Sequence, residues 1–284
     1  MLKILRKCLL LIVICFALTV QAQSFDDIKR AAEQGDAAAQ FSLAKMYNNG
    51  QGVAEDFAEA LKWYRKAAEQ GEAKAQNNLG AMYDSGQGVA EDDAEAVKWY
   101  RKAAEQGVAI AQNNLGVMYD KGLGIEQDYT QAAFWYRKAA EQGNADAQNS
   151  LGASYAKGEG VEQDQAQAAF WYRKAAEQGN ASAQNNLGVM YYEGRGVPQD
   201  YAQAMIWYQK AAAQGNTNAQ DNYNSMVARL ANTDDGATAD VYYEPSGGRD
   251  RRPNRPSGNR PPQHNNPPPQ RPAPQPAPKP ISSR

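Results

Sequence analysis

The chain has 284 residues, a formal net charge of −2 and a hydrophobic fraction of 42%. Its two cysteines, Cys8 and Cys15, both lie in the first 22 residues, so we expect no disulfides in the rest of the chain. The single histidine, His264, lies near the C-terminus, which excludes a histidine general base and ordinary zinc ligand sets from the remainder. No metal or other cofactor is therefore expected.

The first 22 residues have the pattern of a secretory signal peptide. Lys3, Arg6 and Lys7 form a basic start, residues 8–20 are apolar, and residues 20–22 resemble a small-residue cleavage site. The apolar run is short for a membrane-spanning helix, which needs about 20 residues. We expect cleavage after residue 22 and an exported protein, periplasmic or secreted, with no integral membrane span after cleavage.

One nine-residue segment, Trp-Tyr-Arg-Lys-Ala-Ala-Glu-Gln-Gly, dominates the middle of the chain. It recurs every 36 residues, from Trp63, Trp99, Trp135 and Trp171, with a softened copy from Trp207. A strict period of this size indicates stacked repeats, each of which buries its apolar face against its neighbours. Half units at 23–35 and 216–231 would cap five full units, which run 36–71, 72–107, 108–143, 144–179 and 180–215.

Each unit predicts two helices joined by a turn. In the second unit, apolar residues of 75–83 recur at helical spacing, and Gly86 suits the left-handed residue that ends a helix. Asp92 or Asp93 can cap the second helix, and Gly107 follows its end. No segment shows a strand pattern. The predicted fold class is all-α: a solenoid of helix–turn–helix repeats.

Four glycines occupy one position inside the first helices of the units. A glycine in a helix costs about 1 kcal/mol relative to alanine, so its recurrence indicates a bulky neighbour that fills the space of a side chain. We expect that neighbour to be the tryptophan of the unit. The tryptophans could instead form a sugar-binding row, but their identity across units favours a role in the inter-helical core. The glycines are Gly80, Gly116, Gly152 and Gly188.

The segment from Ala111 to Gly143 resembles the Sel-one-like repeat, a branch of the tetratricopeptide-like superfamily. Its Leu-Gly, Gly-x-Gly and Trp-Tyr landmarks recur in five tandem copies across roughly residues 24–231. Three departures stand out: Ala44 at the internal glycine, Ser154 at a methionine and Pro198 in the fifth loop. The resemblance implies a right-handed α/α superhelix that binds other proteins, often as an adaptor in bacterial envelope, signalling or host-interaction pathways.

Pairs of adjacent asparagines on the first helices are the candidate partner-binding residues. If they face an inner groove, their amides can bond to the backbone of a bound peptide, as the resemblance to tetratricopeptide domains implies. Alternatively, they bridge adjacent units or bond turn carbonyls. The sequence leaves both possibilities open. The first row comprises Asn77, Asn113, Asn149 and Asn185, and the second comprises Asn78, Asn114 and Asn186.

An enzymatic alternative rests on two Ser-x-x-Lys matches, Ser42 with Lys45 and Ser154 with Lys157. This spacing carries the serine nucleophile of β-lactam-interacting hydrolases. The two serines occupy different positions in the repeat, and the companion Ser-Asp-Asn and Lys-Thr-Gly elements are missing. We therefore expect no enzymatic activity, and keep a β-lactam-interacting serine hydrolase as the alternative.

The C-terminal residues, 232–284, are expected to form a disordered, basic, Pro-rich tail. Residues 245–284 contain 8 basic and 1 acidic residue and 13 of the 14 prolines, whereas residues 23–244 contain 19 basic and 31 acidic residues. Such a tail cannot bury enough apolar area to fold. It could bind an anionic envelope polymer, an aromatic groove that reads Pro-x-x-Pro, or the acidic body, or it could be a solvated spacer. Nucleic acid is not an expected partner, because of the export signal and the acidic body.

Overall fold

The computed structural model describes residues 25–233; the expected signal peptide and nearly all of the expected tail lie outside this range. The described residues belong to one compact unit, Met1–Ala237. Within them no strand occurs, and the expected all-α solenoid, a right-handed α/α superhelix, is confirmed. After a helix at 25–33 come α2 (Ala37–Asn49), α3 (Phe57–Glu69), α4 (Ala73–Ser85), α5 (Asp93–Glu105), α6 (Ala109–Lys121), α7 (Tyr129–Glu141), α8 (Ala145–Lys157), α9 (Gln165–Glu177), α10 (Ala181–Glu193), α11 (Tyr201–Ala212) and α12 (Thr217–Thr233).

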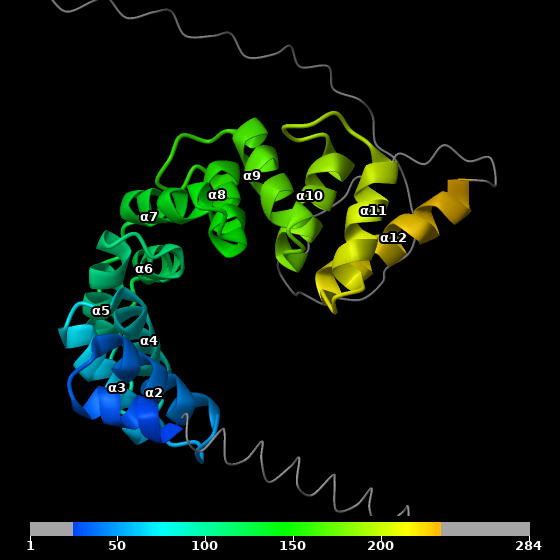
Figure 1. Cartoon of the computed structure of the whole chain (residues 1–284). Coiled ribbons are helices and arrows are strands. Elements are labelled where there is room, and N and C mark those ends of the chain that lie inside the picture. Colours follow the sequence, from blue (N-terminus) through cyan, green and yellow to red (C-terminus); the bar gives the residue numbers. More distant parts are fainter. Residues whose placement is uncertain (1–24, 234–284) are drawn as a thin grey trace, which may run out of the picture. The chain divides into compact units, whose positions relative to one another are not determined.

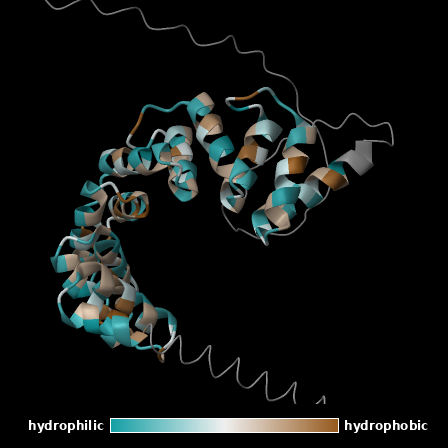
Figure 2. Cartoon of the chain, viewed as in Figure 1, coloured by the Kyte–Doolittle hydropathy of each residue, from teal (hydrophilic) through white to brown (hydrophobic). Residues whose placement is uncertain are grey.

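The helices stack in chain order, and each packs against the helix before it and the helix after it. The first helix of each repeat has an even number and the second an odd number. Within the described unit, α4, α6 and α8 lie on the inner side of the row, and α5, α7 and α9 lie on the outer side (Figure 1). Polar and apolar residues share each helix, as amphipathic packing requires (Figure 2).

Side-chain caps explain where the second helices begin. At α5 the cap is Asp92, not Asp93, and its carboxylate accepts a hydrogen bond from the Glu95 amide at 2.9 Å. An aspartate occupies this position in all five repeats. The first helices end in a left-handed glycine, as expected: Gly86 has φ 67° and donates its amide proton to the Met82 carbonyl. A left-handed glycine therefore ends the first helix of every unit and begins the turn to the second helix.

The internal glycines pack against tyrosine, and the expectation of a tryptophan neighbour is wrong. A Cβ added to Gly80 would lie 2.8 Å from Cδ1 of Tyr100. The same relation holds in the next three repeats, between Gly116 and Tyr136, Gly152 and Tyr172, and Gly188 and Tyr208.

Position in the helix explains this correction. Tyrosine and tryptophan are adjacent in sequence, so they point about 100° apart around the helix. The tyrosine faces the first helix of its own unit. The tryptophan packs where two units meet: Trp171 of α9 lies against a cluster that includes Tyr136 of α7 in the preceding unit and Leu151 of α8 in its own unit. Trp63 and Trp99 are buried, whereas Trp135, Trp171 and Trp207 are only half-buried.

Buried glutamines tie consecutive units together. Gln76 is 4% exposed and donates from Nε2 to the Ala68 carbonyl at 3.1 Å, while its Oε1 accepts from Gln106 Nε2 at 2.7 Å. Each such bond adds about 1 kcal/mol, and leaving a buried amide unpaired would cost more. Equivalent glutamines are buried in every repeat, at Gln40, Gln76, Gln112, Gln148 and Gln184.

Candidate functional site

The asparagine rows lie on the first helices. The first row comes one residue after the buried glutamine, and the second row comes two residues after it. All seven candidate side chains are half-buried, so each amide is in partial contact with solvent. They are Asn77, Asn78, Asn113, Asn114, Asn149, Asn185 and Asn186.

Hydrogen bonds connect the rows across repeat boundaries. Asn114 Nδ2 donates to Asn77 Oδ1 at 3.3 Å, and Asn186 Nδ2 donates to Asn149 Oδ1 at 3.0 Å. Asn222 of α12 continues the pattern with a bond to Asn185 at 3.0 Å. One amide of each pair therefore joins adjacent units, as the bridging alternative expects. The bonded atoms are only part of each amide, so partner binding by the remaining atoms stays a prediction.

The connection is broken between α6 and α8. Ser150 stands where repeats 2, 3 and 5 carry the second asparagine, and its hydroxyl is too short to reproduce the amide bond. Asn113 Oδ1 is buried and has no hydrogen-bond partner among residues 25–233. A buried carbonyl oxygen without a donor costs about 1–3 kcal/mol. Asn113 is therefore the least restrained amide of the first row.

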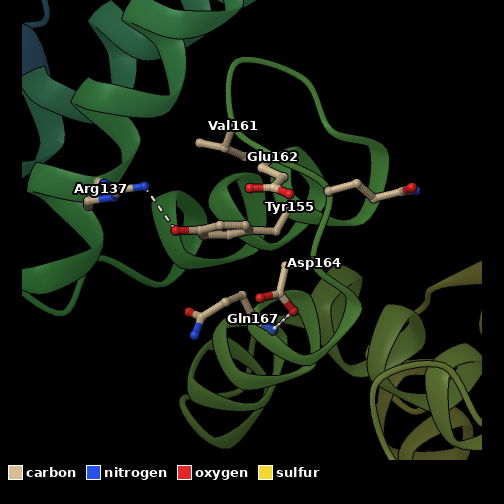
Figure 3. Close-up of a pocket in the computed structure, with 7 residues that line it drawn as sticks. Arg137, Tyr155, Val161, Glu162, Asp164 and Gln167 are labelled. Atoms are coloured by element: carbon tan, nitrogen blue, oxygen red, sulfur yellow. Dashed lines mark hydrogen bonds between the residues drawn. The ribbon is translucent and has the colours of Figure 1, made fainter. Parts of the chain in front are cut away.

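A second feature is a polar pocket of about 620 Å³ between α7, α8 and the start of α9. Arg137 and Tyr155 point toward one another, and the arginine donates to the phenol oxygen at 2.9 Å (Figure 3). Asp164 caps α9 by accepting from the Gln167 amide at 3.0 Å. The loop residues Val161, Glu162 and Gln163 complete the lining. The pocket combines a guanidinium, a phenol and carboxylates, so it can hold a polar side chain.

The pocket is one instance of a repeated arrangement. Arginines of the second helices donate to tyrosines 18 residues later, as Arg101 does to Tyr119 at 2.9 Å and Arg173 to Tyr191 at 2.7 Å. No carboxylate pairs with Arg101, Arg137 or Arg173 in the described part of the chain. Their remaining N–H groups are thus available to an anionic group of a partner.

Three buried tyrosines of the second helices are held neutral. Burial raises the pKa of Tyr100 and Tyr136 far above the usual value for a phenol, and the carboxylates of Asp84 and Asp120 raise it further. Burial also raises the pKa of Tyr172, to about 12, against an opposing effect from Arg195. These phenols belong to the scaffold and not to a site of proton transfer.

The asparagine rows and the arginine–tyrosine pairs both repeat with the period of the fold. The model of the Sel1 repeat matches the chain five times with the same period, over residues 37–72, 73–108, 109–144, 145–180 and 181–216. The chain belongs to the Sel1 repeat family. Sel1 repeats are helical scaffolds that generally mediate contacts between proteins.

Two solved structures show how far the likeness extends. A protective antigen of uropathogenic Escherichia coli that displays an SLR fold is 46% identical, with a TM-score of 0.70. The alignment covers 74% of this chain and 45% of that one, so this chain spans less than half of the antigen's length. A Sel1 repeat protein from Oxalobacter formigenes is 38% identical with a TM-score of 0.65, over 72% of this chain and 86% of that one. No curated protein shows a significant match to the sequence of the chain.

In this Sel1 repeat chain, the Ser-x-x-Lys serines have other contacts. Ser42 Oγ donates to the Ala38 carbonyl at 2.8 Å. Ser154 is buried, while Lys157 is exposed and pairs with Glu159 at 3.2 Å. Neither lysine is hydrogen-bonded to its serine, so the described part of the chain does not assemble the nucleophile and base of the hydrolase alternative.

Within residues 25–233, no group of three His, Cys, Asp or Glu side chains is placed so that it could hold a metal ion. No helix of this range is long and apolar enough to cross a membrane.

Sequence reasoning did not identify the pocket. Arg137 belongs to the repeated nine-residue segment, which we interpreted only as part of the stacked repeat, and Tyr155 was assigned no role. The missed signal was their common spacing: an exposed arginine and a tyrosine 18 residues apart recur in the first four repeats, from Arg65, Arg101, Arg137 and Arg173.

Proposed function

We propose that this protein is an exported adaptor that holds an extended segment of a partner protein along its asparagine rows. The observation that carries the proposal is the pair of half-exposed amides on successive first helices, repeated through the stack. The bridging bonds use Asn186 Nδ2 and Asn149 Oδ1, which leaves the opposite end of each amide for other contacts.

An extended peptide suits these remaining groups. Asn149 Nδ2 and Asn186 Oδ1 have no hydrogen-bond partner within residues 25–233. A side-chain amide that offers both a donor and an acceptor can bond to the C=O and N–H of a peptide backbone without regard to its side chains. Variable residues of the same helices would then set specificity.

A bound peptide would gain the most hydrogen-bond energy at Asn113. Its Oδ1 is buried without a donor, and rotation of the amide toward a bound peptide would restore a hydrogen bond. Its counterparts Asn77 and Asn149 are each held by the next repeat and gain less.

A selected peptide can test the proposal. Extended peptides that bind the purified chain would be isolated from a random displayed library, and their affinity measured by fluorescence anisotropy. We expect the Asn113→Ala and Asn149→Ala double variant to bind about tenfold more weakly, which corresponds to about 1.4 kcal/mol. The helical content measured by circular dichroism should stay unchanged.

The matched control is Asn218→Ala, which removes an exposed asparagine of α12 outside the rows. It should bind like the unmodified chain. Equal affinity of the double variant and the control for every selected peptide would contradict the asparagine version of the proposal.

Export is the second part of the proposal, and the pattern of residues 1–22 supports it. Fractionation of cells that express the full chain or a chain without these residues tests it directly. We expect the full chain in the periplasm or medium, shortened at its N-terminus, and the truncated chain in the cytoplasm.

The basic tail is proposed to bind an anionic envelope polymer. Its support is the excess of basic over acidic residues in 245–284, which is 8 against 1. Removal of these residues should reduce retention on isolated envelopes at low salt, and the difference should disappear at high salt because salt screens charges. Retention independent of the tail would contradict this part.

A further inference from the structure

A row of apolar side chains is exposed on the second helices of the last three repeats. Phe134 of α7 is 48% exposed, Phe170 of α9 is 47% exposed and Ile206 of α11 is 43% exposed. All three occupy the same repeat position, immediately before the tryptophan. In the first two repeats this position holds Lys62 and Lys98.

A second substitution accompanies the first. In repeat 1, Glu59 pairs with Lys62 at 3.0 Å and accepts a hydrogen bond from Trp63 Nε1 at 3.2 Å. In repeats 3 to 5 glutamine replaces this glutamate, so the ion pair is absent and the tryptophans are only half-buried. Each phenylalanine instead packs edge-on against its tryptophan, with ring centroids 5.0 Å apart for Phe134 and Trp135.

The half-buried tryptophans connect the exposed apolar side chains of neighbouring repeats. Trp171 packs against the cluster formed by α7 and α8, and Trp207 against the cluster formed by α9 and α10. Each of these two indoles thus packs against a core cluster that includes the second helix of the preceding repeat. We define the apolar strip as Phe134, Phe170, Ile206 and the indoles of Trp135, Trp171 and Trp207.

Cations border the strip. Lys138 lies 5.0 Å from the ring centroid of Phe134, Lys174 lies 4.8 Å from that of Phe170, and Lys210 lies 4.2 Å from that of Trp207. Arg137 and Arg173 follow one turn after the phenylalanines. None of these five cations forms an ion pair within residues 25–233.

The polar pocket opens beside the strip. Arg137 is three residues from Phe134 on α7, and Gln167 is three residues from Phe170 on α9, so each pair shares a helix face. The pocket in Figure 3 therefore lies between the two helices that carry the exposed phenylalanines. An apolar strip with unpaired guanidinium and ammonium groups at its edge is typical of a protein-binding surface.

We propose that the apolar strip is a docking surface for an acidic, amphipathic segment of a partner protein. The apolar side of that segment would cover Phe134, Phe170 and Ile206. Its carboxylates would pair with the cations along the edge, and one carboxylate would reach Arg137 in the pocket. The strip lies on the second helices, so it is a site separate from the asparagine rows and independent of the function proposed for them.

The charge pattern favours a protein segment over a lipid surface or a second copy of the chain. Exposed Glu141 and Glu177 follow the cations on α7 and α9, and a uniformly anionic membrane would repel them. A segment with spaced carboxylates can avoid these positions. A second copy would offer the same strip, which carries a net positive edge and would repel itself.

A designed peptide serves as the probe. It would be a fluorescent 21-residue amphipathic helix with Leu and Phe on one face and Glu on the flanking positions; one control peptide carries Gln for Glu and another the same residues scrambled. Fluorescence anisotropy with the full chain should show binding of the acidic peptide, at least tenfold weaker binding of the Gln peptide, and weaker binding at high salt.

The variants use residues that the chain already tolerates. Phe134→Lys and Phe170→Lys, combined with Gln131→Glu and Gln167→Glu, give repeats 3 and 4 the pairs seen in repeats 1 and 2. We expect this variant to stay folded and to lose at least tenfold in affinity, whereas Lys62→Ala, on the opposite half, should leave affinity unchanged. Arg137→Gln should weaken binding of the acidic peptide more than it weakens binding of the Gln peptide.

Other outcomes would overturn the proposal. Equal binding of the acidic and scrambled peptides, or of the four-residue variant and the unmodified chain, would remove the strip as a site. Vesicles of phosphatidylcholine and phosphatidylglycerol that bind the chain, with loss in the same variant and no binding of the peptide, would assign the strip to a membrane. Self-association in sedimentation experiments that the variant abolishes would assign it to a second copy.

Discussion

Repeats 1 and 2 differ from repeats 3 to 5 on their outer face, although all five share one scaffold. The first two carry a glutamate that holds both a lysine and the indole N–H of a buried tryptophan, as at Glu95, Lys98 and Trp99. The last three carry glutamine and an exposed apolar side chain, and their tryptophans are half-buried. The difference shows that a solenoid can vary its surface from unit to unit while its packing stays constant.

The shared positions are those that contact two helices at once. In repeats 2 to 5 each core tyrosine fills the space above a glycine of its own unit, and each buried glutamine bonds to the preceding second helix. A change at such a position disturbs several contacts. The position before the tryptophan contacts little beyond its own helix, so lysine, phenylalanine and isoleucine are all compatible with the fold.

Alkaline pH should cause the largest change, and it should affect both halves alike. The pKa values of Tyr100, Tyr136 and Tyr172 are raised in the folded chain, so their stabilising contribution is complete below about pH 10 and is lost as pH rises through the folded pKa. At pH 11 each should cost about 1.4 kcal/mol. Urea unfolding between pH 8 and 11 measures the loss.

A variant isolates the contribution of one tyrosine. Tyr136→Phe should unfold with a weaker pH dependence than the unmodified chain, in which burial also raises the pKa values of Tyr64, Tyr100 and Tyr172. An unchanged slope for this variant would show that other groups cause the alkaline loss.

Overpacking the glycine position should come next in size, again in both halves. A Cβ on Gly116 would meet Tyr136 Cδ1 at 2.6 Å, so Gly116→Leu should displace the ring and destabilise the fold by at least about 3 kcal/mol. Gly80→Leu in repeat 2 should behave the same way. Thermal unfolding checks both.

Alanine provides the control for this prediction, because repeat 1 already holds the buried Ala44 at the equivalent position. Gly116→Ala adds the same Cβ and should also destabilise the fold, but by less than leucine, which adds three more carbon atoms. A Gly116→Leu variant that melts at the same temperature as the unmodified chain would contradict the packing shown by the structure.

Completing the broken asparagine connection should stabilise the chain by a smaller amount. Ser150→Asn places an amide next to Asn113, whose buried Oδ1 lacks a donor, and the new bond should add about 1–2 kcal/mol. The reverse change at an intact position, Asn186→Ser, removes a 3.0 Å bond and should cost about the same. Opposite shifts of the urea midpoint are the expected result; shifts of the same sign would contradict it.

The smallest effects concern the residue near the tryptophan indole, which is glutamate in repeats 1 and 2 and glutamine in repeats 3 to 5. Trp207 Nε1 is buried without a hydrogen-bond partner among the described residues, and Gln203 occupies the position of the acceptor glutamate. Gln203→Glu should stabilise the chain by about 1 kcal/mol. Glu95→Gln weakens the bond to Trp99 and should cost a similar amount.

Tryptophan fluorescence and urea titration measure both changes. The matched control is Gln167→Ala, since it removes the side chain without supplying an acceptor. Stabilisation by the control as large as that by Gln203→Glu would argue against the hydrogen-bond explanation.

Much of the fold could be predicted from the sequence, because its signals are local and repeated five times. The period, the two helices per unit, the glycine turns and the requirement for a bulky neighbour at Gly80 all depend on residues within one unit. The identity of that neighbour could not be predicted, because Tyr100 and Trp99 are adjacent and only the packing of α4 against α5 distinguishes them.

The candidate sites divide in the same way. The sequence by itself determined that amides recur on the first helices and that the residue before the tryptophan changes from lysine in repeats 1 and 2 to phenylalanine or isoleucine in repeats 3 to 5. Only the tertiary structure decided that Asn114 reaches Asn77, that Asn113 Oδ1 is left without a partner among the described residues, and that Arg137 of α7 and Gln167 of α9 line one pocket. The reason is physical: a periodic sequence places equivalent residues on equivalent faces, but the distance between neighbouring units depends on how their helices pack.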